Sequence, residues 1–263
     1  MKKYLFTSLL FYAMLMFGQI QTLNPKFVNS ILFEADDLIG FDNIGNYYYI
    51  KNNVLFKKTE STILQYQNVS LGKIKKVDII NPLKIVLFYE DFNSVVFLDN
   101  LMNEIQKINF SKNEMPIIAS AIGMSGQNQL WLYNSLNQQI GLYDITTNKI
   151  KNLGVPIKES VLYYQTDFNT FNWIDIQNQW FSCSIFGRVV NNGPITFQNQ
   201  VQLLDSNQLI YLNENVLFLN DRNAATNYKI EIVEKSFVKF YFKDQILSIF
   251  TTQGITNYKI ILP

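Results

Sequence analysis

The hydrophobic residues of this chain fall into short runs separated by Asn, Asp and Gly, and this pattern continues from Phe27 to the C-terminus. Apolar or alternating runs of about four to eight residues are typical of β-strands, whereas an amphipathic helix needs apolar positions at a 3.6-residue spacing over a longer stretch. No segment of ten or more residues keeps that helical spacing. The pattern therefore predicts an all-β protein.

The expected strands recur as a unit joined by short turns. The first strand of each unit falls near residues 38, 77, 118, 163, 201 and 238, a period of about 40 residues that suits four-stranded propeller blades. We predict a single β-propeller with about six four-stranded blades. Five or seven blades stay open because the unit between Val161 and Val190 is less regular. The alternative is a β-sandwich with evenly spaced hairpins, but it would need long Greek-key connections.

Closure of the ring is also suggested by the strand pattern. The last unit shows three strands, while a lone apolar run, residues 30–33, precedes the first unit. An N-terminal strand that completes the last blade would remove a long open sheet edge. We therefore expect residues 30–33 to pair beside residues 258–261.

The N-terminus has the layout of a secretory signal peptide. Lys2 and Lys3 precede an apolar run over residues 4–17, and Gly18 offers a small residue at the cut. An uncleaved anchor is the alternative, but a membrane-spanning helix needs about 20 apolar residues. We expect residues 1–18 to be removed and residues 19–263 to form the propeller domain. The protein would then be exported, to the periplasm, the outer membrane or the medium, without a transmembrane segment.

The amino-acid composition limits the catalytic and metal-binding chemistry that the protein can perform. The chain has 22 Lys and Arg, 21 Asp and Glu, no His and one Cys, with a formal net charge of +1. A protein with so small a net charge produces no long-range electrostatic field that would attract nucleic acid. Without His, the commonest general base and the commonest zinc ligand are missing, so we expect no enzyme activity, no metal and no cofactor. Cys183 cannot form an intramolecular disulfide and is interpreted as a buried small hydrophobe.

Two groups of polar residues resemble catalytic motifs. The acidic residues Glu34, Asp36–Asp37 and Glu90–Asp91 leave a glycoside hydrolase open, because such enzymes use two facing carboxylates about 5–10 Å apart. They also lie at strand ends, where acids are ordinary turn residues. Residues 70–73 match S-x-x-K, but the partner motifs of penicillin-binding enzymes are missing. We interpret this segment as a turn between blades.

Aromatic residues suggest where a partner would bind. The less regular unit carries Trp173, Trp180 and Phe186, which we predict to be partner-binding residues. Residues 47–49 are three consecutive Tyr, and consecutive side chains of a strand point to opposite faces. At least one of them should therefore contact another strand layer or a partner.

One unit carries a family resemblance. The segments Leu130-Trp131-Leu132-Tyr133, Gly141-Leu142-Tyr143-Asp144 and Asn148-Lys149 resemble a blade of the regulator-propeller repeats of bacterial envelope proteins, and residues 96–99 are a degraded copy of the second segment. The overall composition is similar to that of small exported proteins of Bacteroidetes-type bacteria. The resemblance implies a propeller, whose partners usually meet loops at one end of the ring.

These observations lead to a functional expectation that rests partly on analogy of fold. We expect a non-enzymatic envelope or secreted protein-interaction module, a scaffold-type propeller that binds other envelope proteins, for instance in outer-membrane assembly or secretion. The alternative is an extracellular glycan-binding protein or a carboxylate-dependent glycoside hydrolase. A third interpretation, the sensor domain of a signalling system, is less well supported, because the sequence shows no transmembrane segment after the signal peptide and no signalling output domain.

Overall fold

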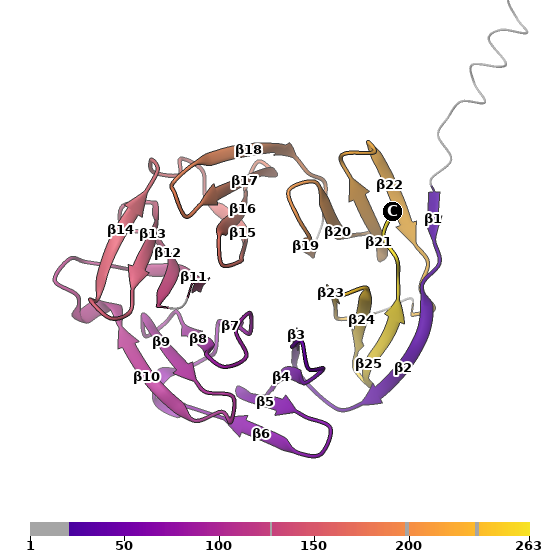
Figure 1. Cartoon of the computed structure of the whole chain (residues 1–263), viewed down its shortest axis with the longest axis horizontal. Coiled ribbons are helices and arrows are strands. Elements are labelled where there is room, and N and C mark those ends of the chain that lie inside the picture. Colours follow the sequence, from indigo (N-terminus) through magenta and orange to yellow (C-terminus); the bar gives the residue numbers. More distant parts are fainter. Residues whose placement is uncertain (1–20, 127, 198–199, 235–236) are drawn as a thin grey trace, which may run out of the picture.

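The computed structural model describes residues 21–126, 128–197, 200–234 and 237–263, so the expected signal peptide, residues 1–18, lies outside the described residues. Six β-sheets are arranged around a central axis (Figure 1). Each sheet is a blade with an inner strand at the axis and an outer strand at the perimeter. In four of the six sheets the strands run outward in chain order, and in the other two the outermost strand comes from the N-terminal segment. The predicted six-bladed β-propeller is confirmed.

The blades are numbered from the first complete unit. Blade 1 contains β3 (Asp37–Phe41), β4 (Tyr47–Lys51), β5 (Val54–Lys58) and β6 (Ile63–Tyr66). Blade 2 contains β7 (Lys76–Asp78), β8 (Ile85–Tyr89), β9 (Ser94–Leu98) and β10 (Glu104–Asn109). Blade 3 contains β11 (Ala119–Ser125), β12 (Gln129–Asn134), β13 (Gln139–Asp144) and β14 (Lys149–Leu153).

The second half of the ring follows the same scheme. Blade 4 contains β15 (Val161–Thr166), β16 (Thr170–Asp175), β17 (Gln179–Ser184) and β18 (Val189–Pro194). Blade 5 contains β19 (Val201–Leu203), β20 (Gln208–Asn213), β21 (Val216–Asp221) and β22 (Thr226–Ile230). Blade 6 contains β23 (Lys239–Lys243), β24 (Ile246–Thr251) and β25 (Gly254–Lys259). The unit that the sequence pattern shows as less regular is thus a complete blade.

The N-terminal strand closes the ring. Strand β2 (Lys26–Leu32) runs antiparallel to β25 and becomes the outer strand of blade 6, with Ser30 opposite Thr256 and Phe27 opposite Tyr258. The predicted closure by an N-terminal strand is confirmed, but the predicted register is wrong: residues 30–32 pair with residues 254–256, and the residues opposite 258–259 are Lys26 and Phe27. The paired strand begins earlier than its apolar run suggests, because an outer strand does not need a continuous apolar sequence, and residues 260–261 lie beyond β25. The closing strand passes so near Gly254 (φ +137°) that a Cβ at this position would collide with the carbonyl of Ile31.

The chain also adds a strand that the sequence pattern did not reveal. Strand β1 (Gln21–Leu23) lies parallel to β22 and is a fifth strand of blade 5. Only two residues separate β1 from β2, so the N-terminal segment crosses from the perimeter of blade 5 to that of blade 6 (Figure 1). The outer edges of two neighbouring blades are therefore covered by one continuous segment.

Turn residues explain the hairpins. Asn52 and Asn53, with φ of 52° and 60°, form the two-residue turn between β4 and β5, as expected for paired Asn in left-handed conformations. In the β3–β4 loop, the Asp42 carboxylate accepts hydrogen bonds from the backbone N–H of Ile44 and Asn46.

The S-x-x-K segment, residues 70–73, overlaps the short 3-10 helix η1 (Val69–Leu71), which lies between blades 1 and 2. The predicted turn between blades is confirmed.

The hydrophobic core is divided into clusters between neighbouring blades. The three consecutive Tyr of β4 show the principle: Tyr48 is buried in the cluster shared with blade 2, whereas Tyr47 packs with blade 6 residues. Tyr49 stacks on Phe56 at 5.2 Å. The alternation predicted for these residues is confirmed. No helix among the described residues has the length and apolar character needed to cross a membrane.

Candidate functional site

The three predicted partner-binding residues all belong to blade 4 but lie on different surfaces. Trp173 (3% exposed) packs in the cluster shared with blade 3. Trp180 (0% exposed) packs in the cluster shared with blade 5, where the Arg222 guanidinium lies 4.8 Å from the centroid of its ring. Phe186 is 89% exposed in the turn between β17 and β18. The structure does not bring the three together, and their part in partner binding stays a prediction.

Trp173 belongs to an apolar groove between blades 3 and 4. The groove has a volume of about 490 Å³ and is lined on its apolar side by Ile140, Leu153, Val155, Trp173, Phe181 and Val189. Strands β13, β14, β16, β17 and β18 and the β14–β15 connection supply these residues. Consecutive blades contribute their facing sides, so residues more than thirty positions apart share one surface.

The floor of the groove contains an unusual polar atom. The Trp173 ring stacks on Phe181 with centroids 5.2 Å apart and an interplanar angle of 13°. Its Nε1 is buried and has no hydrogen-bond partner among the described residues. A buried donor without an acceptor costs about 1–3 kcal/mol, but this N–H has almost no exposed surface, so a molecule in the groove contacts the Trp173 ring and does not reach Nε1.

The rim of the groove is apolar and open to solvent. Val155 is 77% exposed and Val189 is 44% exposed. The turn that carries Phe186 lies against the end of β14, because Gly154 (φ +62°) and Gly187 (φ +83°) approach each other without side chains. We call Val155 and Val189, together with Phe186 on the adjacent turn, the groove rim. Phe186 does not itself line the groove, whose lining also includes polar residues such as Lys158 and Glu159.

The central channel contains a second group of candidate residues. Lys76 and Asp78 project from β7, and the Lys76 ammonium lies 4.9 Å from the ring centroid of Tyr164 in blade 4. Asp78 accepts hydrogen bonds from the backbone N–H of Met124, at 2.8 Å, and of Ile80, at 2.9 Å. Burial lowers the pKa of the Lys76 ammonium and raises the pKa of the Asp78 carboxyl. These contacts tie blade 2 to blades 3 and 4, so we assign the group a structural role.

Four of the five acidic residues that were considered for a glycoside hydrolase form an ion pair or a hydrogen bond with another described residue. Glu34 pairs with Lys51 at 2.7 Å and Glu90 with Lys75 at 2.8 Å. Asp36 accepts a hydrogen bond from the backbone N–H of Asn52, and Asp37 pairs with Lys239. Among the described residues, no group of three or more Cys, Asp or Glu is placed to hold a metal ion.

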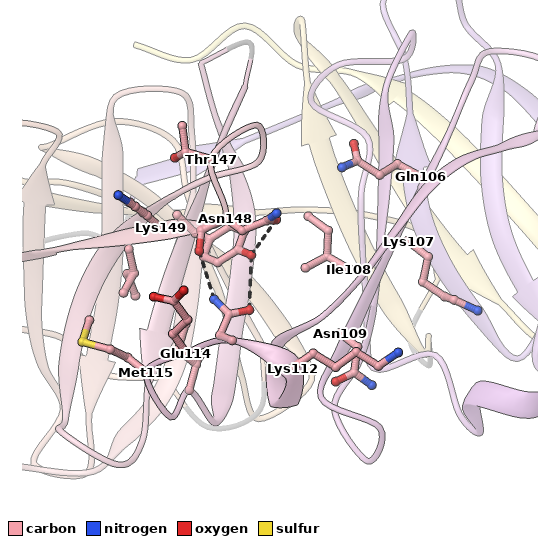
Figure 2. Close-up of a pocket in the computed structure, with 14 residues that line it drawn as sticks. Gln106, Lys107, Ile108, Asn109, Lys112, Glu114, Met115, Thr147, Asn148 and Lys149 are labelled. Carbon is pink, nitrogen blue, oxygen red and sulfur yellow. Dashed lines mark hydrogen bonds between the residues drawn. The ribbon is translucent and has the colours of Figure 1, made fainter.

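A third candidate is a polar cleft of about 670 Å³ between blades 2 and 3 (Figure 2). Blade 2 contributes β10 and the segment after it, which includes the 3-10 helix η2 (Phe110–Lys112); blade 3 contributes β13, β14 and their turn. Tyr143 donates its hydroxyl proton to Asn148 Oδ1 at 3.0 Å, and Asn113 Nδ2 donates to the Asn148 carbonyl at 3.2 Å. No sequence motif predicts this cleft, although the segment from Lys107 to Asn113, rich in Lys and Asn, is a usable signal.

Comparison with known proteins supports the fold. No family model and no curated protein sequence matches the chain. Among solved structures, a streptogramin B lyase aligns over 85% of this chain and 78% of its own, with a TM-score of 0.55 and 13% identity. Virginiamycin B lyase from Staphylococcus aureus, in complex with quinupristin, aligns over 85% and 80%, with a TM-score of 0.56 and 14% identity. The extracellular domain of BT4673 from B. thetaiotaomicron aligns over 90% of this chain and 40% of its own, with a TM-score of 0.52 and 10% identity. At these identities the likeness concerns the β-propeller fold alone.

Proposed function

We propose that this chain is a non-enzymatic, exported interaction module that docks a partner protein at the groove between blades 3 and 4. The observation that carries the proposal is the combination of an apolar groove with an exposed apolar rim, in which Phe186 is 89% and Val155 is 77% exposed. Contiguous exposed apolar surface marks interaction sites, and aromatic residues in and around pockets dominate binding energies.

The partner that fits is an exported or envelope protein that presents an apolar side chain. That side chain would fill the groove over Trp173 and Phe181. The signal-peptide layout predicted for residues 1–18 supports a location outside the cytoplasm, and the chain has no His for acid–base catalysis. The expected cut after Gly18 would leave β1, which begins at Gln21, intact.

The docking proposal is tested by site-specific photocrosslinking in the native host. The photoreactive residue p-benzoylphenylalanine replaces Phe186 in one variant and Val69 in a matched control. Val69 is equally open, 83% exposed, but lies in η1 between blades 1 and 2. The proposal expects a discrete crosslinked protein at position 186 that is absent at position 69. The double substitution of Val155→Ser and Phe186→Asp should abolish co-purification of that protein.

The outcome that contradicts docking at the groove is equally concrete. If position 186 gives no product beyond that of position 69 while the fold is intact by circular dichroism, the groove rim is not a protein interface.

Export is tested separately, by mass spectrometry of the N-terminal peptide from envelope and medium fractions. The proposed location requires a peptide that begins at Gln19.

A further inference from the structure

Strand β18 is an open edge at the perimeter of blade 4, directly beside the apolar groove. It is the last strand of its sheet, and in Figure 1 no other described strand lies outside it. Its residues Val189 and Asn191 line the groove between blades 3 and 4. Val189 is 44% and Val190 is 39% exposed, so the edge is accessible to another molecule.

The backbone of β18 offers hydrogen-bonding groups along this edge. The Ser184 N–H donates to the Arg188 carbonyl at 3.0 Å across the hairpin of β17 and β18. Residues two apart in an antiparallel strand repeat the same bonding direction, and the residues between them point the other way. The N–H and C=O groups of Val189 and Asn191 therefore point away from β17, toward the open edge. These two residues present side chains to the groove and backbone groups to the edge.

The chain itself shows that a perimeter strand of this propeller accepts a further strand. Strand β1 pairs in parallel with β22, the fourth strand of blade 5, and the Glu231 N–H donates to the Leu23 carbonyl at 2.9 Å. Recognition by strand addition combines such backbone bonds, which supply affinity, with side-chain pockets, which supply specificity. Strand β18 has both, because the groove lies along its edge.

The charge of β18 differs from that of the other fourth strands of blades 1 to 4. It carries no charged residue, whereas β10 and β14 carry Glu104, Lys107, Lys149 and Lys151. Charged side chains, Lys above all, protect an edge strand from pairing with another chain. Strand β6 is also uncharged but has only four residues. Strand β18 is therefore the longest of these edges without a charge.

Both arginines of the chain, Arg188 and Arg222, flank β18. Arg188 directly precedes the strand, and Arg222 Nη2 donates to the carbonyl of Pro194, at the other end, at 2.9 Å. The ion pairs between described residues involve lysines alone. By strand alternation Arg188 lies on the face opposite to Val189, toward blade 5, to which Arg222 belongs. A segment added to β18 would meet apolar side chains on its blade 3 side and positive charge on its blade 5 side.

We propose that the partner docked at the groove binds as an added β-strand on the open edge of β18. The partner's segment is extended, and apolar residues over the groove alternate with acidic residues that face Arg188 and Arg222. The six residues of β18 set the length of this segment at about six residues. The inference rests on the proposed function, because it specifies the form in which the partner presents its apolar side chain to the groove.

The test is selection of random seven-residue peptides, displayed on phage, against the purified protein. The proposal expects enriched peptides in which apolar and acidic residues alternate. The leading peptide is then synthesised, and its affinity is measured by fluorescence anisotropy while its backbone nitrogens are methylated one at a time. Every second N–H of an added strand bonds to the edge. Methylation at alternate positions should therefore weaken binding about tenfold or more, and methylation between them should have little effect.

Matched variants of the protein test the edge itself. Asn191→Pro removes the backbone N–H that faces the edge and Asn191→Ala keeps it, while both lose the hydrogen bond that the Asn191 side chain accepts from the Gly193 N–H. Asn191→Pro should weaken binding about tenfold or more, and Asn191→Ala less than about threefold. Arg188→Gln should weaken binding and reduce its dependence on salt. Lys112→Gln, at an exposed lysine between blades 2 and 3, should have no effect.

Three results would each overturn strand addition at β18: no enriched peptide, an equal effect of N-methylation at every position, or equal binding to Asn191→Pro and Asn191→Ala. The N-methyl series uses the unaltered protein, so it gives a result even if a variant fails to fold. The two proposals fail separately. A crosslink at position 186 combined with any of these results leaves docking at the groove in place without an added strand, whereas the absence of the crosslink overturns the docking.

Discussion

Lys239 Nζ lies 2.8 Å from Asp37 Oδ1, and this ion pair joins the inner strands of the last and the first blade. The two side chains are 37% and 43% exposed, so water screens the attraction and the pair contributes about 0–1 kcal/mol. The antiparallel ladder of β2 with β25 and the apolar cluster in which Leu38 of blade 1 packs with Phe250 of blade 6 therefore supply most of the closure energy. We expect Lys239→Met to change the free energy of unfolding by less than about 1 kcal/mol, measured by urea titration.

Closure of the propeller ring is most sensitive to substitution at Gly254. Its φ of +137° is unfavourable for other residues, and a Cβ would collide with the Ile31 carbonyl of the closing strand. Gly254→Val should therefore destabilise the fold by roughly 2–5 kcal/mol, from backbone strain and from displacement of β2. Urea unfolding followed by tryptophan fluorescence measures the loss, and limited proteolysis should cut near residues 21–32 first.

The control for this prediction is Gly45→Ala. Gly45 also has a positive φ, +87°, but a Cβ there would meet nothing within 4 Å. Backbone strain alone should cost about 1–2 kcal/mol. If both substitutions reduce stability equally, the close approach of β2 is not what makes Gly254 necessary.

The strands that the sequence analysis found and missed differ in burial. Strands β8 and β9 are buried along their whole length, and their continuous apolar runs reveal them. Strands β6 and β22 are the fourth strands of their blades and carry partly exposed, mixed residues such as Gln65 and Asn227, and no periodic pattern marks them. The strands of a propeller blade are thus harder to recognise in the sequence the nearer they lie to the perimeter, because outer strands bury fewer apolar side chains.

The candidate sites were less predictable for a related reason. Trp173 and Trp180 are adjacent in the hairpin of β16 and β17, yet they face different neighbouring blades. The groove instead combines Trp173 with Val155, and the polar cleft combines Gln106 with Asn148. Hairpin spacing predicts pairing within a blade. It does not predict which side chains of two packed blades meet.

The Asp42 carboxylate predicts a pH-dependent contribution to stability. Burial by itself raises its pKa, but hydrogen bonds from Asn46, Ile44 and Tyr48 outweigh that effect and hold the pKa below the ordinary value of 3.8. A depressed pKa means that the stabilisation is fully present above pH 3.8 and is lost as the pH falls through the lower folded-state value. Asp42→Ala should cost about 2–3 kcal/mol at pH 7, and the difference from the wild type should shrink below pH 3.8.

The measurement is urea unfolding of both proteins from pH 7 to pH 3. Asp99 provides a matched comparison because its carboxylate accepts equivalent hydrogen bonds from Leu101 and Asn103 in an exposed loop. Asp99→Ala should cause a smaller loss than Asp42→Ala, since water replaces the lost contacts. A loss from Asp42→Ala that is the same at every pH would contradict a role for its charge.

Trp131 joins blades 3 and 4 by a specific hydrogen bond. Its indole is fully buried, and Nε1 donates to the Asp167 carbonyl at 2.8 Å. Trp131→Phe keeps an aromatic ring but removes the donor and leaves a small void, so we expect a loss of about 2 kcal/mol. Trp180→Phe is the comparison in the next interface, where Nε1 donates to Asn172 at 3.3 Å, and its loss should be smaller.

Cys183 reports on opening of the propeller. The thiol is fully buried between blades 3 and 4, and burial raises its pKa to about 11. Thiolate is the reactive form, so the native protein should react with Ellman's reagent only when blades 3 and 4 separate. We expect negligible labelling in buffer, a rate that rises with urea in parallel with the unfolding rate, and complete labelling in the unfolded chain. Rapid labelling in buffer, at a rate proportional to reagent concentration, would show instead that the blade 3–blade 4 interface opens without unfolding of the ring.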